Sequence, residues 1–147
     1  HLLANQTLAQ ALVPGMREAK YGRIVNIIST SVYEPIPGLG VSNTTRGAVA
    51  SWAKTLSREL AANGITVNNV LPGYTETGRI DQIVRGRMAK EGLSEAEVRA
   101  DMVAGVPARR FARPEEPAGL IAFLCAPAGG YINGQSIAVD GGRMMSI

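Results

Sequence analysis

Two clusters of hydroxyl-bearing residues each follow a short apolar segment of the chain. Residues 29–31 (STS) come directly after the segment 22–28, and residues 72–77 (PGYTET) come directly after the segment 65–71. If these segments are parallel strands, the clusters lie beyond their carboxyl ends, where open sheets bind their ligands. Taken alone, such clusters form turns and helix caps more often than catalytic sites. Their shared position makes them candidates for a binding site.

A serine and an arginine lie between these clusters. Arg46 follows Ser42 at helical spacing. Arginine carries a permanent charge and a fork of N–H donors, so Arg46 could stabilise an oxyanion. A serine hydroxyl is a much poorer acid than a tyrosine phenol, whose reference pKa is about 10. Ser42 is therefore a poor candidate for a proton donor.

Alternating apolar segments predict an α/β fold around these residues. Short, β-branched segments predict buried strands at 22–28, 65–71 and 135–139. Periodicity and end signals predict helices at 3–13 (closed by Pro14-Gly15), 43–62, 80–90, 94–103 and from Pro114 onward. Strands joined by long helical crossovers must pair in parallel, and three are too few for a stable doubly wound sheet. The chain is therefore predicted to form half of such a sheet.

Composition limits the classes of function. The chain has 147 residues, 46% of them hydrophobic, so one core and one domain are expected. Its single cysteine, Cys125, excludes an internal disulfide, and a single histidine, His1, disfavours a metal site. A net charge of +3, 5% aromatic residues and the absence of long apolar runs disfavour nucleic-acid and membrane partners. We expect a cytoplasmic protein without a metal.

The arginines are densest between residues 79 and 113. A solvated helical face is the plainer interpretation of this stretch. A basic rim that meets a phosphate-bearing substrate or carrier is the alternative.

Four stretches of the sequence together resemble the short-chain dehydrogenase/reductase family. N-I-I-S at 26–29, followed by Ser42 and Arg46, is similar to the family's strand-end serine and its Y-x-x-x-K motif. The other stretches are NGITVNNVLPG at 63–73, RPEEPA at 113–118 and YINGQSIAVDGG at 131–142, which resemble GIRVNxVxPG, RPEEVA and YITGQxIxVDGG of the family. These stretches span nearly the whole chain in the family's order.

The resemblance implies that residues 1–147 are the C-terminal half of a single NAD(P)-binding domain with a Rossmann-type, doubly wound parallel sheet. The family's glycine-rich phosphate-binding loop belongs to the first half, and no such loop occurs here. We therefore expect the N-terminal half to be absent from this chain, together with the residue that selects between the cofactors. The implied cofactor is NAD or NADP.

The resemblance also implies roles at the first cluster. Ser29 would polarise a substrate carbonyl, Ser42 falls at the proton-donating tyrosine, and Arg46 falls at the lysine that lowers the pKa of that tyrosine. Losing a positioned proton donor typically costs roughly 10²–10⁴-fold in rate, so altered proton delivery is expected. Tyr33, just beyond Ser29, is an alternative donor. His1 falls where the family has an asparagine that supports a proton-relay water, and it could relay protons or have no role.

At the second cluster, the resemblance places the nicotinamide of the cofactor. Pro72 and Gly73 would turn beneath it, with Thr75 and Thr77 near its carboxamide, which offers both a donor and an acceptor. The structural alternative for this loop is a Pro-Gly turn followed by a threonine that caps the next helix.

The first hypothesis for function is an NAD(P)-dependent oxidoreductase, similar to 3-oxoacyl-carrier-protein reductases, that acts on a small carbonyl or alcohol with altered proton delivery. The alternative hypothesis keeps the fold without redox chemistry: a protein that binds dinucleotide or completes an oligomer. In either case the resemblance implies a homodimer or homotetramer.

Overall fold

A parallel three-stranded sheet organises the structure. The computed structural model describes residues 1–146. The sheet has the order β1-β2-β3, with strands β1 (Gly22–Ile27), β2 (Ile65–Pro72) and β3 (Ser136–Val139). Both pairings are parallel, with Gly22 opposite Ile65 and Asn69 opposite Ser136. The predicted α/β class, strand positions and parallel pairing are confirmed.

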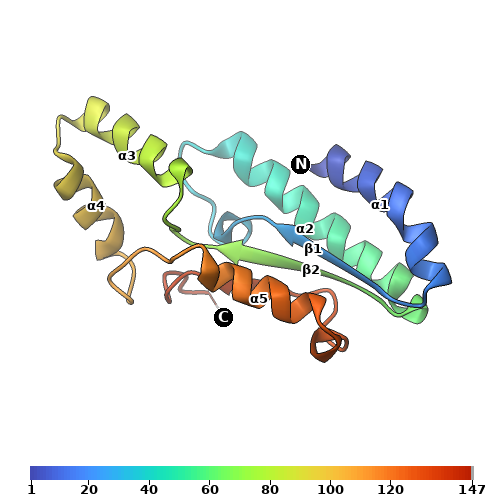
Figure 1. Ribbon diagram of the computed structural model, residues 1–147. Helices are drawn as coiled ribbons and strands as arrows, with labels where there is room; N and C mark the ends of the chain where they lie inside the picture. Colours follow the sequence, from blue (N-terminus) through green and yellow to red (C-terminus); the bar gives the residue numbers. More distant parts are fainter. Residues whose placement is uncertain (147) are drawn as a thin grey trace.

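Helices cover both faces of this sheet (Figure 1). Helices α1 (Leu2–Glu18) and α2 (Gly40–Leu60) lie on one face, and α5 (Glu115–Cys125) packs on the other face against β1 and β2. Helices α3 (Gly78–Glu91) and α4 (Glu95–Ala104) form a separate pair beyond one end of the sheet. Short 3-10 turns follow β1, α2 and α5 at Thr30–Val32, Ala61–Asn63 and Pro127–Gly129.

The central strand β2 carries the core. Its residues from Ile65 to Leu71 are all buried, as expected for a strand covered on both faces. The two asparagines inside it are hydrogen-bonded, as buried polar groups must be. Asn68 accepts from the backbone N–H of Gln135 and donates to the carbonyl of Ile132. Asn69 accepts from Asn26 of β1 and donates to the hydroxyl of Ser136, so one polar row crosses the sheet.

The first helix is longer than its sequence indicates. We predicted that Pro14-Gly15 closes this helix, but α1 continues to Glu18 with Pro14 inside it. Proline removes one backbone hydrogen bond. Val13 is buried in the cluster between α1, α2 and β2, and Met16 packs against that cluster, so tertiary burial compensates for the lost bond. The prediction of the helix end was wrong because packing outweighed the local signal.

The start of α2 also differs from its prediction. The helix begins at Gly40, before the predicted start at residue 43, so Ser42 lies in its first turn. The predicted pair 80–90 and 94–103 corresponds to α3 and α4, and the predicted capping box is present, with Glu97 and Ser94 bonded reciprocally. In the described residues, no helix is both long and apolar enough to span a membrane.

Candidate functional site

The carboxyl ends of β1 and β2 open into one hollow of about 470 Å³. Its walls come from the segment after β1, the first turns of α2, the loop after β2 and the start of α5. The structure brings all of the predicted site residues together along this hollow: Ser29, Ser42, Arg46, Pro72, Gly73, Thr75 and Thr77. Apolar wall residues that sequence analysis did not single out are Ile36, Leu39, Ile83, Pro117 and Ile121.

Ser29 is held at the end of β1 by a local cap. The strand pairing extends one residue past Ile27, because the N–H of Ile28 donates to the carbonyl of Val70 at 3.0 Å. Ser29 then precedes a 3-10 turn, and its hydroxyl oxygen accepts from the N–H of Ser31 at 3.1 Å. This cap uses a lone pair and leaves the hydroxyl hydrogen to point at a ligand. The half-buried Ser29 is therefore both a cap and a possible donor to the hollow.

Ser42 and Arg46 form a pair on the first turns of α2. The Arg46 guanidinium Nη1 donates to the Ser42 Oγ at 2.5 Å, and both side chains are partly buried. This bond fixes the Ser42 oxygen as an acceptor toward Arg46 and places a permanent positive charge beside it. Asn43 closes the preceding loop, since its amide donates to the carbonyl of Ile36 at 2.9 Å. The two positions at which the sequence departs from the family motif are thus coupled to each other.

The loop after β2 is positioned by backbone contacts. Gly73 allows the end of β2 to approach the segment after β3, because a Cβ there would lie 2.7 Å from the Asp140 Cα. Its N–H donates to the carbonyl of Val139 at 2.9 Å. Farther on, Ala112 N–H donates to Tyr74 O, and Glu76 N–H donates to Ala112 O, each at 2.9 Å. The loop is therefore held by two neighbouring segments.

The threonines of this loop direct their hydroxyls back along the chain. Thr75 Oγ1 donates to the Gly73 carbonyl at 3.2 Å, and Thr77 Oγ1 donates to the Thr75 carbonyl at 3.3 Å. Thr77 occupies the N-cap position of α3, but its side chain makes no capping bond. The hydroxyl of Thr77 thus does not perform the helix-capping role of the structural alternative.

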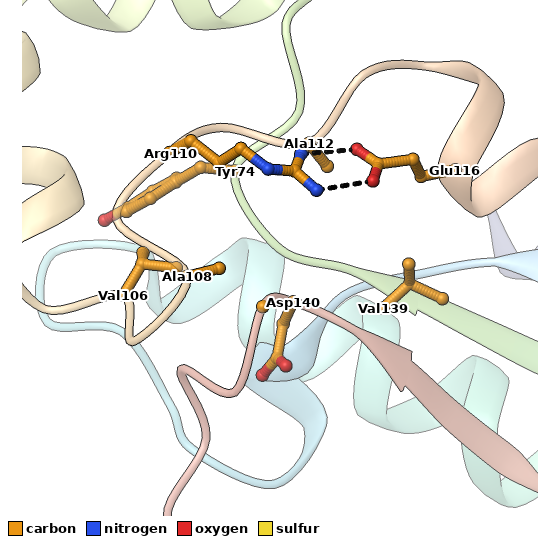
Figure 2. Close-up of a pocket in the computed structure, with 9 residues that line it drawn as sticks. Tyr74, Val106, Ala108, Arg110, Ala112, Glu116, Val139 and Asp140 are labelled. Carbon is orange, nitrogen blue, oxygen red and sulfur yellow. Dashed lines mark hydrogen bonds and ion pairs between the residues drawn. The ribbon is translucent and has the colours of Figure 1, made fainter.

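An ion pair braces the segment that holds the loop (Figure 2). The two Nη atoms of Arg110 each lie 2.6 Å from an oxygen of Glu116, and the Arg113 N–H donates to Glu116 at 2.7 Å. The Arg110 guanidinium, aided by the Arg113 N–H, lowers the pKa of Glu116 to about 2. The pair borders a small cavity of about 80 Å³ beside Tyr74 and Asp140. Because Ala112 lies between these partners, the brace fixes the segment that bonds the loop.

Other arginines of the 79–113 stretch are paired with carboxylates too. Arg99 contacts Glu76, Asp81 and Glu95, which joins α4 to the loop and to α3. Arg87 contacts Glu91 and Asp101. Arg87 and Arg99 therefore connect helices, whereas Arg79 lines the hollow, so these contacts do not decide between the two sequence interpretations.

Comparison with known proteins decides the family. The family described as enoyl-(acyl carrier protein) reductase matches residues 2–144. The chain belongs to the short-chain dehydrogenase/reductase family. The NADPH-dependent reductase BacG of Bacillus subtilis (strain 168) is 36% identical over 132 residues, which are 90% of this chain and 51% of BacG. The 3-oxoacyl-[acyl-carrier-protein] reductase FabG of Vibrio cholerae is 36% identical over 140 residues, 94% of this chain and 52% of FabG.

A solved structure of a reductase has the same fold as this chain. L-sorbose reductase from Gluconobacter frateurii, in complex with NADPH and L-sorbose, superposes with a TM-score of 0.93 at 30% identity. The superposition covers 100% of this chain and 56% of that reductase. The chain spans about half the length of the curated relatives it matches, in agreement with the predicted half of a Rossmann-type fold.

The tyrosines of this short-chain dehydrogenase/reductase segment differ in their relation to the hollow. Tyr33, the predicted alternative donor, is 51% exposed and is absent from the residues that line the hollow. Tyr74 lines the hollow, but its ring packs edge-on against Phe111 and beneath the Arg143 guanidinium. His1 lies instead in an adjoining hollow that also contains Ser42 and Arg46. In the sequence, only the family resemblance indicated that His1 lies near Ser42 and Arg46.

Proposed function

We propose that the full-length protein is an NAD(P)-dependent oxidoreductase that interconverts a small carbonyl compound and its alcohol. The observation that carries this proposal is the convergence of Ser29, the Ser42–Arg46 pair and the loop 72–77 on one hollow at the carboxyl edge of the sheet. The named relatives are reductases, and BacG and the L-sorbose reductase complex involve NADPH. NADPH is therefore the first cofactor to test.

The chemistry of the hollow fits the nicotinamide end of such a cofactor. Thr75 and Thr77 supply hydroxyls of the kind that pair with a carboxamide, and the Arg46 guanidinium can donate to ribose hydroxyls. Pro72 and the neighbouring isoleucines provide apolar surface for the flat ring. The cofactor would supply a hydride, while these side chains bind and orient it.

On this proposal, the substrate oxygen lies between Ser29 and the Ser42–Arg46 pair. The Ser29 hydroxyl donates to the carbonyl oxygen, because its oxygen already accepts the cap bond from Ser31. Arg46 stabilises the negative charge that develops on the oxygen and holds Ser42 beside it. Arginine stays protonated at ordinary pH and serine is a weak acid, so proton delivery differs from a tyrosine-based site.

The same pair is the observation that favours the second candidate function. Ser42, at the family's tyrosine position, is hydrogen-bonded to Arg46. A site without a tyrosine to donate the proton can bind a dinucleotide without turnover. Such a protein would contribute cofactor binding or an oligomer surface instead of catalysis.

The test uses the full-length protein. Titrations with NADPH and NADH, followed by nicotinamide fluorescence, measure cofactor binding, and a panel of ketones and acyl thioesters measures turnover. We expect binding, with turnover of at least one carbonyl class. Tight binding without turnover across the panel would contradict the oxidoreductase and support the second candidate. Absence of binding to either cofactor would contradict both.

Self-association is a further part of the proposal. Phe123 at the end of α5 is 44% exposed, and Tyr131, just before β3, is fully exposed. Apolar surface beside the closing strand supports a homodimer or homotetramer. Light scattering on the full-length protein should give a mass of two or four chains, and a monomer at micromolar concentration would contradict this prediction.

A further inference from the structure

We propose that Arg79 determines the substrate class of this site, which is a small oxo acid whose carboxylate binds the Arg79 guanidinium. The proposal rests on the oxidoreductase function above and deepens it, because it names the substrate. Arg79 lies in the first turn of α3 and lines the same hollow as Ser29, Ser42 and Arg46. Helices α2 and α3 begin at the same end of the sheet (Figure 1). A substrate that reacts beside Ser29 and the side chain of Arg79 therefore share one hollow.

The charged side chains on the walls of this hollow are all positive. Among the described residues that line it, these are Arg46 and Arg79, and no aspartate or glutamate lines it. On the proposed function, Arg46 holds Ser42 and serves the cofactor ribose and the substrate oxygen. Arg79 is the second cation, and a guanidinium binds a carboxylate through two parallel N–H···O bonds. The lining therefore favours a ligand with an anionic group apart from its carbonyl.

The carboxylates nearest to Arg79 in the sequence are engaged by another arginine. Glu76 and Asp81 contact Arg99 of α4 at 3.3 Å and 2.9 Å. In the described part of the chain, the side-chain partner of the Arg79 guanidinium is the amide oxygen of Gln82, at 3.3 Å. This neutral acceptor lies just beyond the usual N–H···O range of about 2.7–3.2 Å, so a carboxylate would form the stronger, charge-assisted bond in its place. Arg79 is therefore available to an anionic ligand.

The fold anchors the backbone that carries Arg79. Ile80, the next residue, is only 4% exposed and lies in one buried cluster with Val84 of α3 and Val98 of α4. Its N–H donates to the carbonyl of Thr77, just before the helix, at 2.9 Å. Because the first turn of α3 is already in place, a ligand has to order only the Arg79 side chain, which keeps the entropic cost of binding small.

The rest of the hollow sets the size and polarity of the ligand. Many of its other walls are apolar, including Ile36, Leu39, Ile83 and Ile121. Such walls bind the body of a small molecule, while a few polar groups fix its orientation. The hollow of about 470 Å³ must also admit the nicotinamide, so the matching substrate is a small oxo acid with an apolar body. Its reduction consumes NADPH and one proton and gives the hydroxy acid and NADP⁺, while the carboxylate takes no part.

The test compares oxo acids with their methyl esters on the full-length protein, because each pair differs in the negative charge. With NADPH, wild type should show a kcat/KM about 10–100-fold higher for the acid, mainly through a lower KM. Arg79→Gln should remove this preference and leave kcat/KM for the ester unchanged, and Arg79→Lys should restore part of it. Arg85→Gln, at an exposed position of α3 outside the hollow, is the matched control and should keep the wild-type preference.

The remaining outcomes separate this proposal from the proposed function. The affinity for NADPH, followed by nicotinamide fluorescence, should be the same in Arg79→Gln and wild type. Equal kcat/KM for acid and ester in wild type, or an acid preference that survives in Arg79→Gln, would overturn the role of Arg79 and leave the oxidoreductase standing. Turnover confined to coenzyme A thioesters and weakened in Arg79→Gln would assign Arg79 to a carrier phosphate and overturn the oxo acid. Cofactor binding without turnover of any carbonyl compound would overturn both.

Discussion

The two loops that form the site are held in different ways. The loop after β2 is fixed by its backbone: Gly73 bonds Val139, and Tyr74 and Glu76 bond Ala112. The segment that leads from β1 into α2 presents its chemistry through side chains, above all the Ser42–Arg46 bond. Backbone hydrogen bonds persist through many side-chain substitutions, whereas a side-chain hydrogen bond is lost when either of its two residues is replaced. The difference fits the sequence, in which the loop 72–77 keeps the family pattern while positions 42 and 46 depart from it.

The largest expected effect comes from a substitution in the Ser42–Arg46 pair. On the proposed function, Arg46→Gln removes the charge that stabilises the substrate oxygen, so kcat/KM for carbonyl reduction should fall about 10²–10³-fold. Steady-state kinetics of the full-length protein measures this loss. Arg58→Gln, an exposed change on the same helix, is the control and should leave kcat/KM unaltered. An Arg46→Gln variant with full activity would show that the pair is structural.

A substitution in the loop after β2 should lower the stability of the fold instead. Gly73→Ala puts a Cβ within 2.7 Å of the Asp140 Cα, so the strand ends must separate. We expect the free energy of unfolding to fall by roughly 1–3 kcal/mol, measured by urea denaturation, with weaker NADPH binding. Gly78→Ala is the matched control, because a Cβ there meets nothing within 4 Å. Equal stability of the two variants would contradict the close approach.

A smaller effect is expected from the hydroxyl of the backbone loop. Thr75→Val keeps the shape of the side chain and removes the hydroxyl that we propose contacts the cofactor carboxamide. The loss of about 1 kcal/mol corresponds to roughly fivefold weaker NADPH binding in a fluorescence titration. Thr55→Val, an exposed threonine on α2, should bind NADPH as the wild type does. Unchanged binding in Thr75→Val would place the carboxamide elsewhere.

The smallest effect concerns the brace behind the backbone loop. The folded pKa of Glu116, about 2, lies below the reference value of about 4.3, so its stabilisation is complete above pH 4.3 and is lost as pH falls toward 2. Glu116→Gln should therefore unfold at lower urea than wild type at neutral pH, and the difference should vanish near pH 2. Partial exposure of the pair keeps the effect small. The neighbouring Glu115→Gln should show a smaller difference from wild type at neutral pH.

Local patterns determined the framework of this molecule. Short, β-branched and mostly apolar segments placed the three parallel strands, because a strand covered on both faces needs apolar side chains on both sides. Since the carboxyl ends of parallel strands share one edge, the same segments predicted that Ser29 and the loop 72–77 would meet, and the structure confirms their meeting at one hollow. The motif spacing of Ser42 and Arg46 added the remaining predicted residues of that hollow. Their roles in catalysis stay predictions.

Tertiary structure decided what depends on partners distant in sequence. Pro14 signals a helix end locally, yet burial of Val13 against α2 and β2 carries α1 through it. The spacing of the arginines gives no sign that Arg110 braces the loop 72–77 through Glu116, because that role depends on how the chain returns past Tyr74. His1 shares a hollow with Ser42 only because α1 packs on α2. The sequence by itself determines the helices and strands, because each follows from the local spacing of its apolar residues. Side-chain pairings between elements are decided only when those elements pack.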